Sequence, residues 1–346
     1  MRIDRVIAGL RRGVILGAAA GVLVLVLGAA CGSSESTPAP AGVPDTKGSL
    51  ERLPVIATVP LPGEPMLMTV AGGKLWVSFV DDGSVAAVDP ATNRLGPRTR
   101  LANGAGAQLD NPLAGDQREL WAVDNANDRV VRVDAKSGKA GAALDVESPI
   151  ELTIAFGSVW IAQFESYKVI RVDPRTTHIS ARLSASGPTD VDAGAGSIWV
   201  LAHRSDEVLR IDPATNRVSA TIRLTTAAST PERMAFGEDA LWVTDPPGNS
   251  VTRIDPATNR ATAEVMMPER SWPFQVSTGG GYVWVMGEQH VFRVDPRTNK
   301  VTGAAQLTEA FDPAFGALTD VEYAFGSVWA VDRADHKLFR LRPAVK

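Results

Sequence analysis

Residues 241–259 read LWVTDPPGNSVTRIDPATN, and variants of this phrase occur seven times in the chain of 346 residues. Each copy holds one tryptophan, and successive tryptophans are 45, 39, 39, 43, 42 and 45 residues apart: Trp76, Trp121, Trp160, Trp199, Trp242, Trp284 and Trp329. An aspartate follows thirteen residues after each of the first five and eleven residues after the sixth: Asp89, Asp134, Asp173, Asp212, Asp255 and Asp295. A strand-like repeat with a period near 40 residues is typical of β-propeller blades and not of a helical solenoid.

The third copy, residues 149–186, shows how one unit divides into strands. Residues 150–155 (IELTIA) alternate apolar and polar side chains, and residues 159–162 (VWIA) are continuously apolar, as in a strand covered on both faces. Residues 168–173 (KVIRVD) and 178–183 (HISARL) give two more strands, joined by a turn that Asp173-Pro174 favours. We therefore predict an all-β fold, a seven-bladed β-propeller with four-stranded antiparallel blades.

The two ends of the repeat array predict how the ring closes. A single blade cannot bury both faces, so neighbouring blades must cover it, and the repeat tryptophans are expected between blades. The seventh unit stops at residues 341–343, after its third strand. Residues 53–61 (LPVIATVPL) match the pattern of a fourth strand such as residues 220–224 (ATIRL). We predict that this N-terminal strand closes the last blade and removes the exposed sheet edges.

The first 31 residues have the layout of a bacterial export signal. Four arginines precede an uninterrupted run of small and apolar residues at 13–30, which ends in LGAAC with Cys31 as the last residue. This pattern resembles a lipobox, in which Cys31 is lipidated after cleavage of residues 1–30. The alternative is an uncleaved transmembrane anchor, because 18 apolar residues can just span a bilayer. Both readings predict an exported protein, on the outer face of the cytoplasmic membrane.

Composition divides the rest of the chain into a tether and one folded domain. Residues 31–50 are rich in Ser, Pro, Gly, Ala and Thr and predict a flexible tether, while 51–346 hold the propeller. Cys31 is the single cysteine, so the folded domain has no disulfide and no thiol chemistry. The net charge is −4, and residues 1–30 carry four arginines and one aspartate, so residues 31–346 carry −7. An acidic surface argues against nucleic acid or anionic lipid as a main partner.

Candidate site residues lie in the loops between the second and third strands, which differ between units while the strands repeat. Three of the four histidines, His203, His290 and His336, lie in these loops. Glu288 and His290 in the sixth blade, with His336 in the seventh, are the candidate catalytic or metal-binding set, because a histidine pair with a carboxylate can act as acid and base. The alternative is that polar loops simply carry polar side chains.

Further loop residues are candidates for ligand binding. They are His203, Asp124, Asp128, Asp245, Asp332 and Trp272. Residues 124–128 carry oxygen ligands of the kind that calcium prefers, without the glycine and glutamate of an EF-hand loop. Trp272 is the eighth tryptophan and lies outside the repeat, either as a surface contact or as packing for its own loop. No ligand spacing matches an established metal motif, so no metal site is assigned.

The phrases at 241–244 (LWVT) and 251–259 (VTRIDPATN), with their counterparts in other units, resemble the YVTN and streptogramin-lyase-like propellers over residues 53–346. The resemblance implies seven blades. For a streptogramin lyase it also implies magnesium-dependent elimination in a cyclic depsipeptide, with histidine and glutamate at the channel mouth. Glu288, His290 and His336 are the residues of this chain that approach such a set. The YVTN relatives include a DNA-binding propeller, which the charge of −7 disfavours here.

Two classes of function remain open from the sequence. The first is a binding or scaffolding module at the cell envelope that presents its loops to a protein, peptide or small molecule. The second is a metal-dependent lyase or hydrolase, with Mg²⁺ as its cofactor. We favour the first because the loop chemistry is scattered and does not converge on one motif. We expect a monomer that contacts the membrane through its N-terminal lipid alone.

Overall fold

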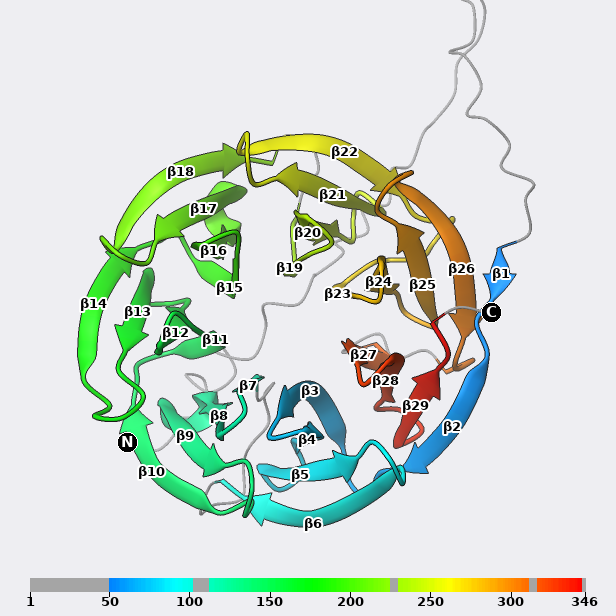
Figure 1. Cartoon of the computed structure of the whole chain (residues 1–346), viewed down its shortest axis with the longest axis horizontal. Coiled ribbons are helices and arrows are strands. Elements are labelled where there is room, and N and C mark those ends of the chain that lie inside the picture. Colours follow the sequence, from blue (N-terminus) through cyan, green and yellow to red (C-terminus); the bar gives the residue numbers. More distant parts are fainter. Residues whose placement is uncertain (1–49, 102–111, 225–229, 311–315, 344–346) are drawn as a thin grey trace, which may run out of the picture. The chain divides into compact units, whose positions relative to one another are not determined.

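The computed structural model describes residues 50–101, 112–224, 230–310 and 316–343. The strands of the compact unit Glu51–Lys346 form seven sheets arranged as a closed ring of blades (Figure 1). The predicted signal, the predicted lipidation site Cys31 and the predicted tether up to residue 49 lie outside the described residues. None of the helices in the described part is long and apolar enough to cross a membrane.

Blades 1 to 5 each consist of four consecutive antiparallel strands, with the first strand innermost in the ring (Figure 1). Blades 1 and 2 contain β3 (Pro65–Ala71), β4 (Lys74–Phe79), β5 (Ser84–Asp89), β6 (Arg94–Arg100), β7 (Leu113–Gly115), β8 (Glu119–Asp124), β9 (Arg129–Asp134) and β10 (Ala140–Asp145). Blades 3 to 5 contain β11 (Pro149–Ala155), β12 (Ser158–Gln163), β13 (Lys168–Val172), β14 (Ile179–Ser184), β15 (Pro188–Gly194), β16 (Ser197–Ala202), β17 (Glu207–Asp212), β18 (Arg217–Arg223), β19 (Met234–Gly237), β20 (Ala240–Asp245), β21 (Ser250–Asp255) and β22 (Arg260–Met266). Two short 3₁₀ turns lie in second-to-third-strand loops, η1 (Asn125–Asn127) and η2 (His203–Ser205).

The last two blades combine both ends of the chain. They contain β23 (Gln275–Gly279), β24 (Tyr282–Met286), β25 (His290–Asp295), β26 (Lys300–Gln306), β27 (Leu318–Ala324), β28 (Ser327–Asp332) and β29 (Lys337–Leu341). The strand β2 (Val55–Pro60) pairs antiparallel with β29, which confirms the predicted closure of the last blade. A further strand was not foreseen: β1 (Glu51–Arg52) pairs parallel with β26 and gives blade 6 a fifth strand.

Each tryptophan of the repeat is buried between blades, and five of the seven also hold a hairpin turn. The seven side chains are at most 2% exposed. In six blades the turn before the tryptophan strand places two residues at positive φ, the type I′ geometry that suits tight hairpins. In five blades the indole Nε1 donates a hydrogen bond to the carbonyl that opens this turn, that of Ala71, Gly194, Gly237, Gly279 or Ala324. The tryptophan therefore fixes the first two strands of its own blade as well as the core.

The arginine of the repeat phrase connects its blade to the next in blades 2 to 7, whereas blade 1 has Ala87 at this position. In blade 4, the guanidinium of Arg210 lies over the ring of Trp199, and its Nε donates to Ser197 Oγ at 2.8 Å. Its Nη1 donates to the carbonyl of Pro256 and to Asn259 Oδ1 in blade 5, at 2.6 and 2.9 Å. Equivalent contacts to the next blade are made by Arg171, Arg253 and Arg340. The DPxTN turn is thus the acceptor for the preceding blade.

The aspartate of the same turn stabilises the turn itself. Asp212 Oδ1 accepts the backbone N–H of Ala214 at 2.8 Å, and Asp255 Oδ1 accepts that of Ala257 at 2.8 Å. These backbone N–H groups hold the pKa values of both carboxyl groups below their ordinary value. The asparagine that ends the turn has a positive φ, 55° at Asn216. Asparagine tolerates this left-handed conformation better than most residues, which explains why the repeat has Asn at this position.

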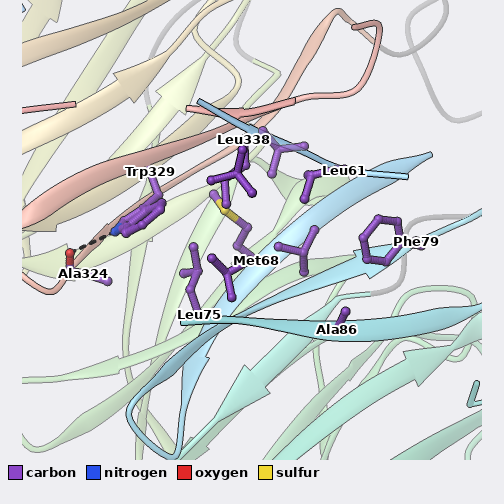
Figure 2. Close-up of a cluster of buried hydrophobic side chains, with 12 residues drawn as sticks. Leu61, Met68, Leu75, Phe79, Ala86, Ala324, Trp329 and Leu338 are labelled. Carbon is purple, nitrogen blue, oxygen red and sulfur yellow. Dashed lines mark hydrogen bonds between the residues drawn. The ribbon is translucent and has the colours of Figure 1, made fainter. Parts of the chain in front are cut away.

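Aromatic side chains fill the space between blades where small residues permit it. Phe236 of blade 5 stacks on Trp199 of blade 4, with ring centroids 6.3 Å apart. A Cβ on Gly194 would lie 1.9 Å from the Phe236 ring, so this position requires glycine. Between blades 7 and 1, Trp329, Leu338 and Leu61 form one buried cluster with residues of β3 to β5 (Figure 2).

The closing blade offers a direct test of the arginine contact. Arg340 Nη1 donates to the carbonyl of Pro90 and to Asn93 Oδ1 of blade 1, about 250 residues away in the chain. Arg340→Met keeps the aliphatic stem over Trp329 and removes the donors. We expect the free energy of unfolding to fall by about 1–3 kcal/mol, measured by urea denaturation. The exposed Arg342→Met is the control, and equal effects of the two changes would contradict the role of the contact.

Candidate functional site

A cavity of about 330 Å³ lies on the axis of the ring, where the innermost strands of all seven blades meet. Each blade contributes two positions of the same strand face. One is the residue that pairs with the repeat tryptophan: Thr69, Ala114, Thr153, Asp192, Ala235, Ser277 or Glu322. The other stands two residues earlier: Leu67, Pro112, Glu151, Asp190, Arg233, Gln275 or Asp320. The lining therefore differs from blade to blade, although the blade framework repeats.

Five carboxyl groups and one guanidinium dominate this lining. The carboxyl groups come from blades 3, 4 and 7, and the guanidinium is that of Arg233 at the start of the inner strand of blade 5: Glu151, Asp190, Asp192, Asp320, Glu322 and Arg233. No histidine is among the described residues that line the cavity. With so many carboxyl groups near one cation, the cavity favours bound protons or cationic groups.

Three of the carboxylates also have a structural role between blades. Asp190 Oδ2 accepts the backbone N–H of Met234 at 2.7 Å, and Asp192 Oδ2 accepts that of Phe236 at 2.7 Å. Asp320 Oδ2 accepts the backbone N–H of Met68 at 2.6 Å, across the closure between blades 7 and 1. Neighbouring inner strands belong to different sheets, so these side chains satisfy donors that no strand ladder reaches.

The two glutamates are less engaged with the framework. Glu151 Oε1 accepts the N–H of its own neighbour Leu152 at 3.0 Å, and Glu322 is hydrogen-bonded by the side chain of Ser277. Neither accepts a backbone N–H from another blade among the described residues. Arg233 reaches the carbonyl of Thr189 in blade 4 and lowers the pKa of the Glu151 carboxyl by its charge. Glu151, Glu322 and Arg233 are therefore the side chains best placed to contact a ligand.

Burial in the channel wall raises the pKa of every carboxyl group in the cluster. The pKa rises to about 8 at Glu151 and Glu322 and to about 7 at Asp192 and Asp320, with loss of hydration as the main cause. The neighbouring Asp190 carboxyl adds to the rise in pKa at Glu151, and its own pKa is raised by burial. Near neutral pH the cluster therefore holds protons that an exposed carboxylate would release.

These shifts predict how stability depends on pH. The folded state binds protons on these carboxyl groups that the unfolded chain loses above its ordinary pKa near 4, so stability falls as pH rises from about 4.5 through 8. We expect the Tm to be lower at pH 8.5 than at pH 5.5. The double variant Glu151→Gln/Glu322→Gln should match the parent at pH 5.5 and exceed its Tm at pH 8.5, measured by scanning calorimetry. A Tm that rises by the same amount in both proteins over this range would contradict the assignment.

The acidic loop candidates are buried parts of their own loops. Asp124 is 4% exposed, accepts Arg129 Nε at 2.8 Å and holds the amide of Asn127. Asp245 accepts the N–H of Gly248 at 3.1 Å. Asp332 is fully buried and accepts the N–H of Asp335, while its Oδ2 has no partner among the described residues. Burial raises the pKa of the Asp332 carboxyl.

Three other ligand candidates lie on loops of different blades. Asp128 Oδ1 accepts the N–H of Ser148 at 2.9 Å, and His203 Nδ1 lies 3.1 Å from the carbonyl of Pro231. Trp272 is 49% exposed and has a φ of 50°, and its N–H is held by Asn249 Oδ1 at 3.1 Å. None of these contacts brings the three side chains together, so each stays a separate candidate.

The candidate catalytic set lies on blades 6 and 7. His290 opens β25 and stacks on Phe292 with centroids 5.5 Å apart, and burial lowers the pKa of its imidazole. Glu288 is partly buried, which raises the pKa of its carboxyl, and its N–H donates to the carbonyl of Ser271. His336 is exposed in a turn with φ of 54°. Within the described residues no interaction joins His336 to the other two, and no group of three His, Cys, Asp or Glu has the geometry of a metal site.

The channel residues were missed at the level of sequence, although a signal for them existed. The alternation at residues 150–155 indicates a strand, and the polar side chains of that strand, Glu151 and Thr153, line the channel. In a propeller the innermost strand has one face toward the neighbouring blade and one toward the axis. Polar pairs two residues apart at the start of a unit, such as Asp190 with Asp192 and Asp320 with Glu322, therefore mark the channel.

No protein-family model and no curated protein matches this sequence. Solved structures with a similar fold include a streptogramin B lyase, with a TM-score of 0.70 and 17% identity over 83% of this chain and 96% of that one. A hydrazine synthase from Kuenenia stuttgartiensis gives a TM-score of 0.70 and 15% identity over 87% of this chain and 99% of that one. The β-propeller domain of Cps50 (Swd1) from Myceliophteria thermophila gives 0.68 and 13%, over 84% and 99%.

This chain and the three solved structures are similar in their fold. At identities of 13–17%, this likeness confirms the propeller architecture that the repeat phrase predicted, including the similarity to the streptogramin lyase fold. The three proteins are described by unrelated functions, so a shared ring of blades leaves the activity to be argued from the site.

Proposed function

We propose that this protein is an exported, lipid-anchored binding module of the cell envelope, whose axial cavity receives a small ligand with a cationic group. The observation that carries the proposal is the lining of that cavity, five carboxyl groups around Arg233 contributed by blades that otherwise share one pattern. The volume of about 330 Å³ is at the lower end of the range for small-molecule sites. Anchoring through Cys31 rests on the signal-like sequence of residues 1–31.

Binding is favoured over catalysis because the cavity holds its polar groups in place. Asp190, Asp192 and Asp320 are fixed by backbone N–H groups of the next blade, which suits a preformed recognition surface. Glu151 and Glu322 supply acceptors for an ammonium group. A cationic ligand then replaces the protons that these carboxyl groups hold near neutral pH, so binding should release protons and strengthen as pH rises.

Spermidine is a suitable first probe, because it carries several ammonium groups on a narrow chain. Isothermal titration of the propeller in buffers of different ionisation enthalpy, at pH 6.0 and pH 8.5, measures both affinity and proton release. We expect the affinity for spermidine to be at least about tenfold higher at pH 8.5 than at pH 6.0, with protons released on binding. Glu151→Gln/Glu322→Gln should weaken binding by about tenfold or more, while the exposed Glu269→Gln should not.

Either of two results would count against the axial site. One is a spermidine affinity that is unchanged in the double variant, which would place the binding on the acidic outer surface. The other is that none of spermidine, choline and arginine amide binds at pH 8.5, which would show that this cavity is not a site for cationic ligands.

A lyase of the streptogramin B type is the second candidate. What favours it is the group of channel carboxyls with pKa values of about 7 to 8, since general acids and bases work best when their pKa lies near the working pH. The described residues offer no cluster with the geometry of a metal site, so no magnesium-dependent step is derived.

The lyase candidate is tested by incubating the propeller with a cyclic streptogramin B, with magnesium or with chelator. Chromatography and mass spectrometry distinguish an isomeric elimination product from a hydrolysis product that gains the mass of water. We expect unchanged substrate. A magnesium-dependent isomeric product that is lost in Glu151→Gln/Glu322→Gln or in His290→Ala would make the protein a lyase and replace the binding proposal.

A further inference from the structure

A second cavity, of about 580 Å³, lies between blades 5 and 6 and away from the axis. Its walls are the first hairpin turns of these blades and the DPxTN turn of blade 6: Glu238, Asp239, Arg253, Gly280, Gly281, Tyr282, Pro296 and Arg297. In an antiparallel blade, these turns lie at the end opposite the second-to-third-strand loops. We refer to this cavity as the blade 5–6 groove.

The groove coincides with a change in the repeated arginine contact. In blades 3, 4 and 7 a serine two residues before the tryptophan accepts the arginine Nε at 2.8–2.9 Å. The Nε of Arg132 in blade 2 pairs with Glu119, and that of Arg293 in blade 6 donates to Thr302 Oγ1. In blade 5 this position is Ala240, and Arg253 has no acceptor for Nε among the described residues.

Arg253 is therefore hydrogen-bonded through its Nη1 alone, while its guanidinium lies over the ring of Trp242, 5.4 Å from the centroid. That nitrogen donates to the carbonyl of Pro296 at 2.8 Å and to Asn299 Oδ1 at 3.3 Å, the longest of the arginine–asparagine contacts in the ring. The remaining N–H groups of a guanidinium match the two oxygens of a carboxylate. In a groove that Arg253 lines, they are available to a ligand.

The rest of the groove combines an aromatic ring, bare backbone and the opposite charge. In blade 6, Tyr282 stands where blades 3, 4 and 7 have the serine that accepts the arginine Nε. The guanidinium of Arg293 covers one side of the Tyr282 ring, 4.7 Å from its centroid. A Cβ on Gly281 would meet nothing within 4 Å, whereas the ring of Tyr323 covers Gly280. Glu238 accepts the N–H of Gly281, while Asp239 is exposed and forms no ion pair with a described residue.

We propose that the blade 5–6 groove binds a small zwitterion, a short peptide with free termini, through its carboxylate on Arg253 and its ammonium group near Asp239. Arg253 lies on the strand β21 and Asp239 on the first turn of blade 5, and no ion pair between described residues joins them. The other two charged residues of the lining have partners, Glu238 in the N–H of Gly281 and Arg297 in Asp295. Gly281 leaves room for the peptide backbone, and Tyr282 provides an apolar side for its side chains. This site is independent of the axial cavity.

Trialanine, its N-acetyl form and its C-terminal amide are the probes, titrated by calorimetry at pH 7. We expect trialanine to bind, the amide to lose about tenfold or more in affinity, and the acetylated form to lose severalfold. Ala240→Ser supplies the Nε acceptor that blades 3, 4 and 7 contain, so it should reduce trialanine affinity by about tenfold while keeping or raising the Tm. Ala257→Ser makes the same chemical change outside the groove and should leave the affinity unchanged.

The variants separate this proposal from the axial site. Glu151→Gln/Glu322→Gln should bind trialanine as the parent does, since neither residue lines the groove. Absence of trialanine binding at millimolar concentration would overturn the proposal, as would equal affinity of the parent and Ala240→Ser. Equal binding of trialanine and its amide would exclude Arg253 as the carboxylate partner.

Discussion

The contact between one arginine and the turn of the following blade is the interaction on which the ring depends. In blade 4 the guanidinium of Arg210 lies over its own tryptophan, and its Nη1 donates to the DPxTN turn of blade 5. The tryptophan fills the core between blades, and the aspartate and asparagine hold the turn in shape to accept the arginine. One short phrase therefore specifies a strand, a turn and an interface, which is why it recurs with so little change. Repetition alone is sufficient because each blade contacts just its two neighbours.

The same constraint explains where variation is tolerated. The tryptophan, the arginine and the DPxTN turn lie in the outer three strands of a blade. The axis-facing side of the innermost strand can therefore differ between blades without loss of the interface. This chain has placed carboxyl groups there, and three of them bind backbone N–H groups of the next blade. The acidic lining therefore contributes to the wall that it occupies. Burial raises the pKa of each of its carboxyl groups, to about 7 at Asp192 and Asp320 and to about 8 at Glu151 and Glu322.

Departures from the repeat have structural causes that can be named. Blade 6 carries an extra strand because Glu51 forms an ion pair with the buried Arg293 and β1 pairs with β26 before the chain crosses to blade 7. Blade 7 has no DPxTN turn, and Arg293 donates instead to the carbonyl of Pro343. In blade 5 the change from serine to Ala240 removes an acceptor from Arg253, and a groove lies at that point. Irregular positions in a repeat protein are therefore the places to look for function.

The sequence by itself determined the architecture, because the period of the tryptophans, the strand pattern and the unpaired strand at residues 53–61 are local properties of the chain. It did not determine the axial cluster. Glu151, Asp190 and Glu322 are far apart in the chain and look like ordinary alternation within strands, and they meet because ring closure directs one face of seven separate strands to a common axis. The loop histidines stood out because histidine is rare in this sequence, yet the structure shows no contact that joins His336 to Glu288 or His290 among the described residues. Shared position around an axis is a tertiary property, and the polar pairs at the start of a unit indicate it only when the ring of blades is already known.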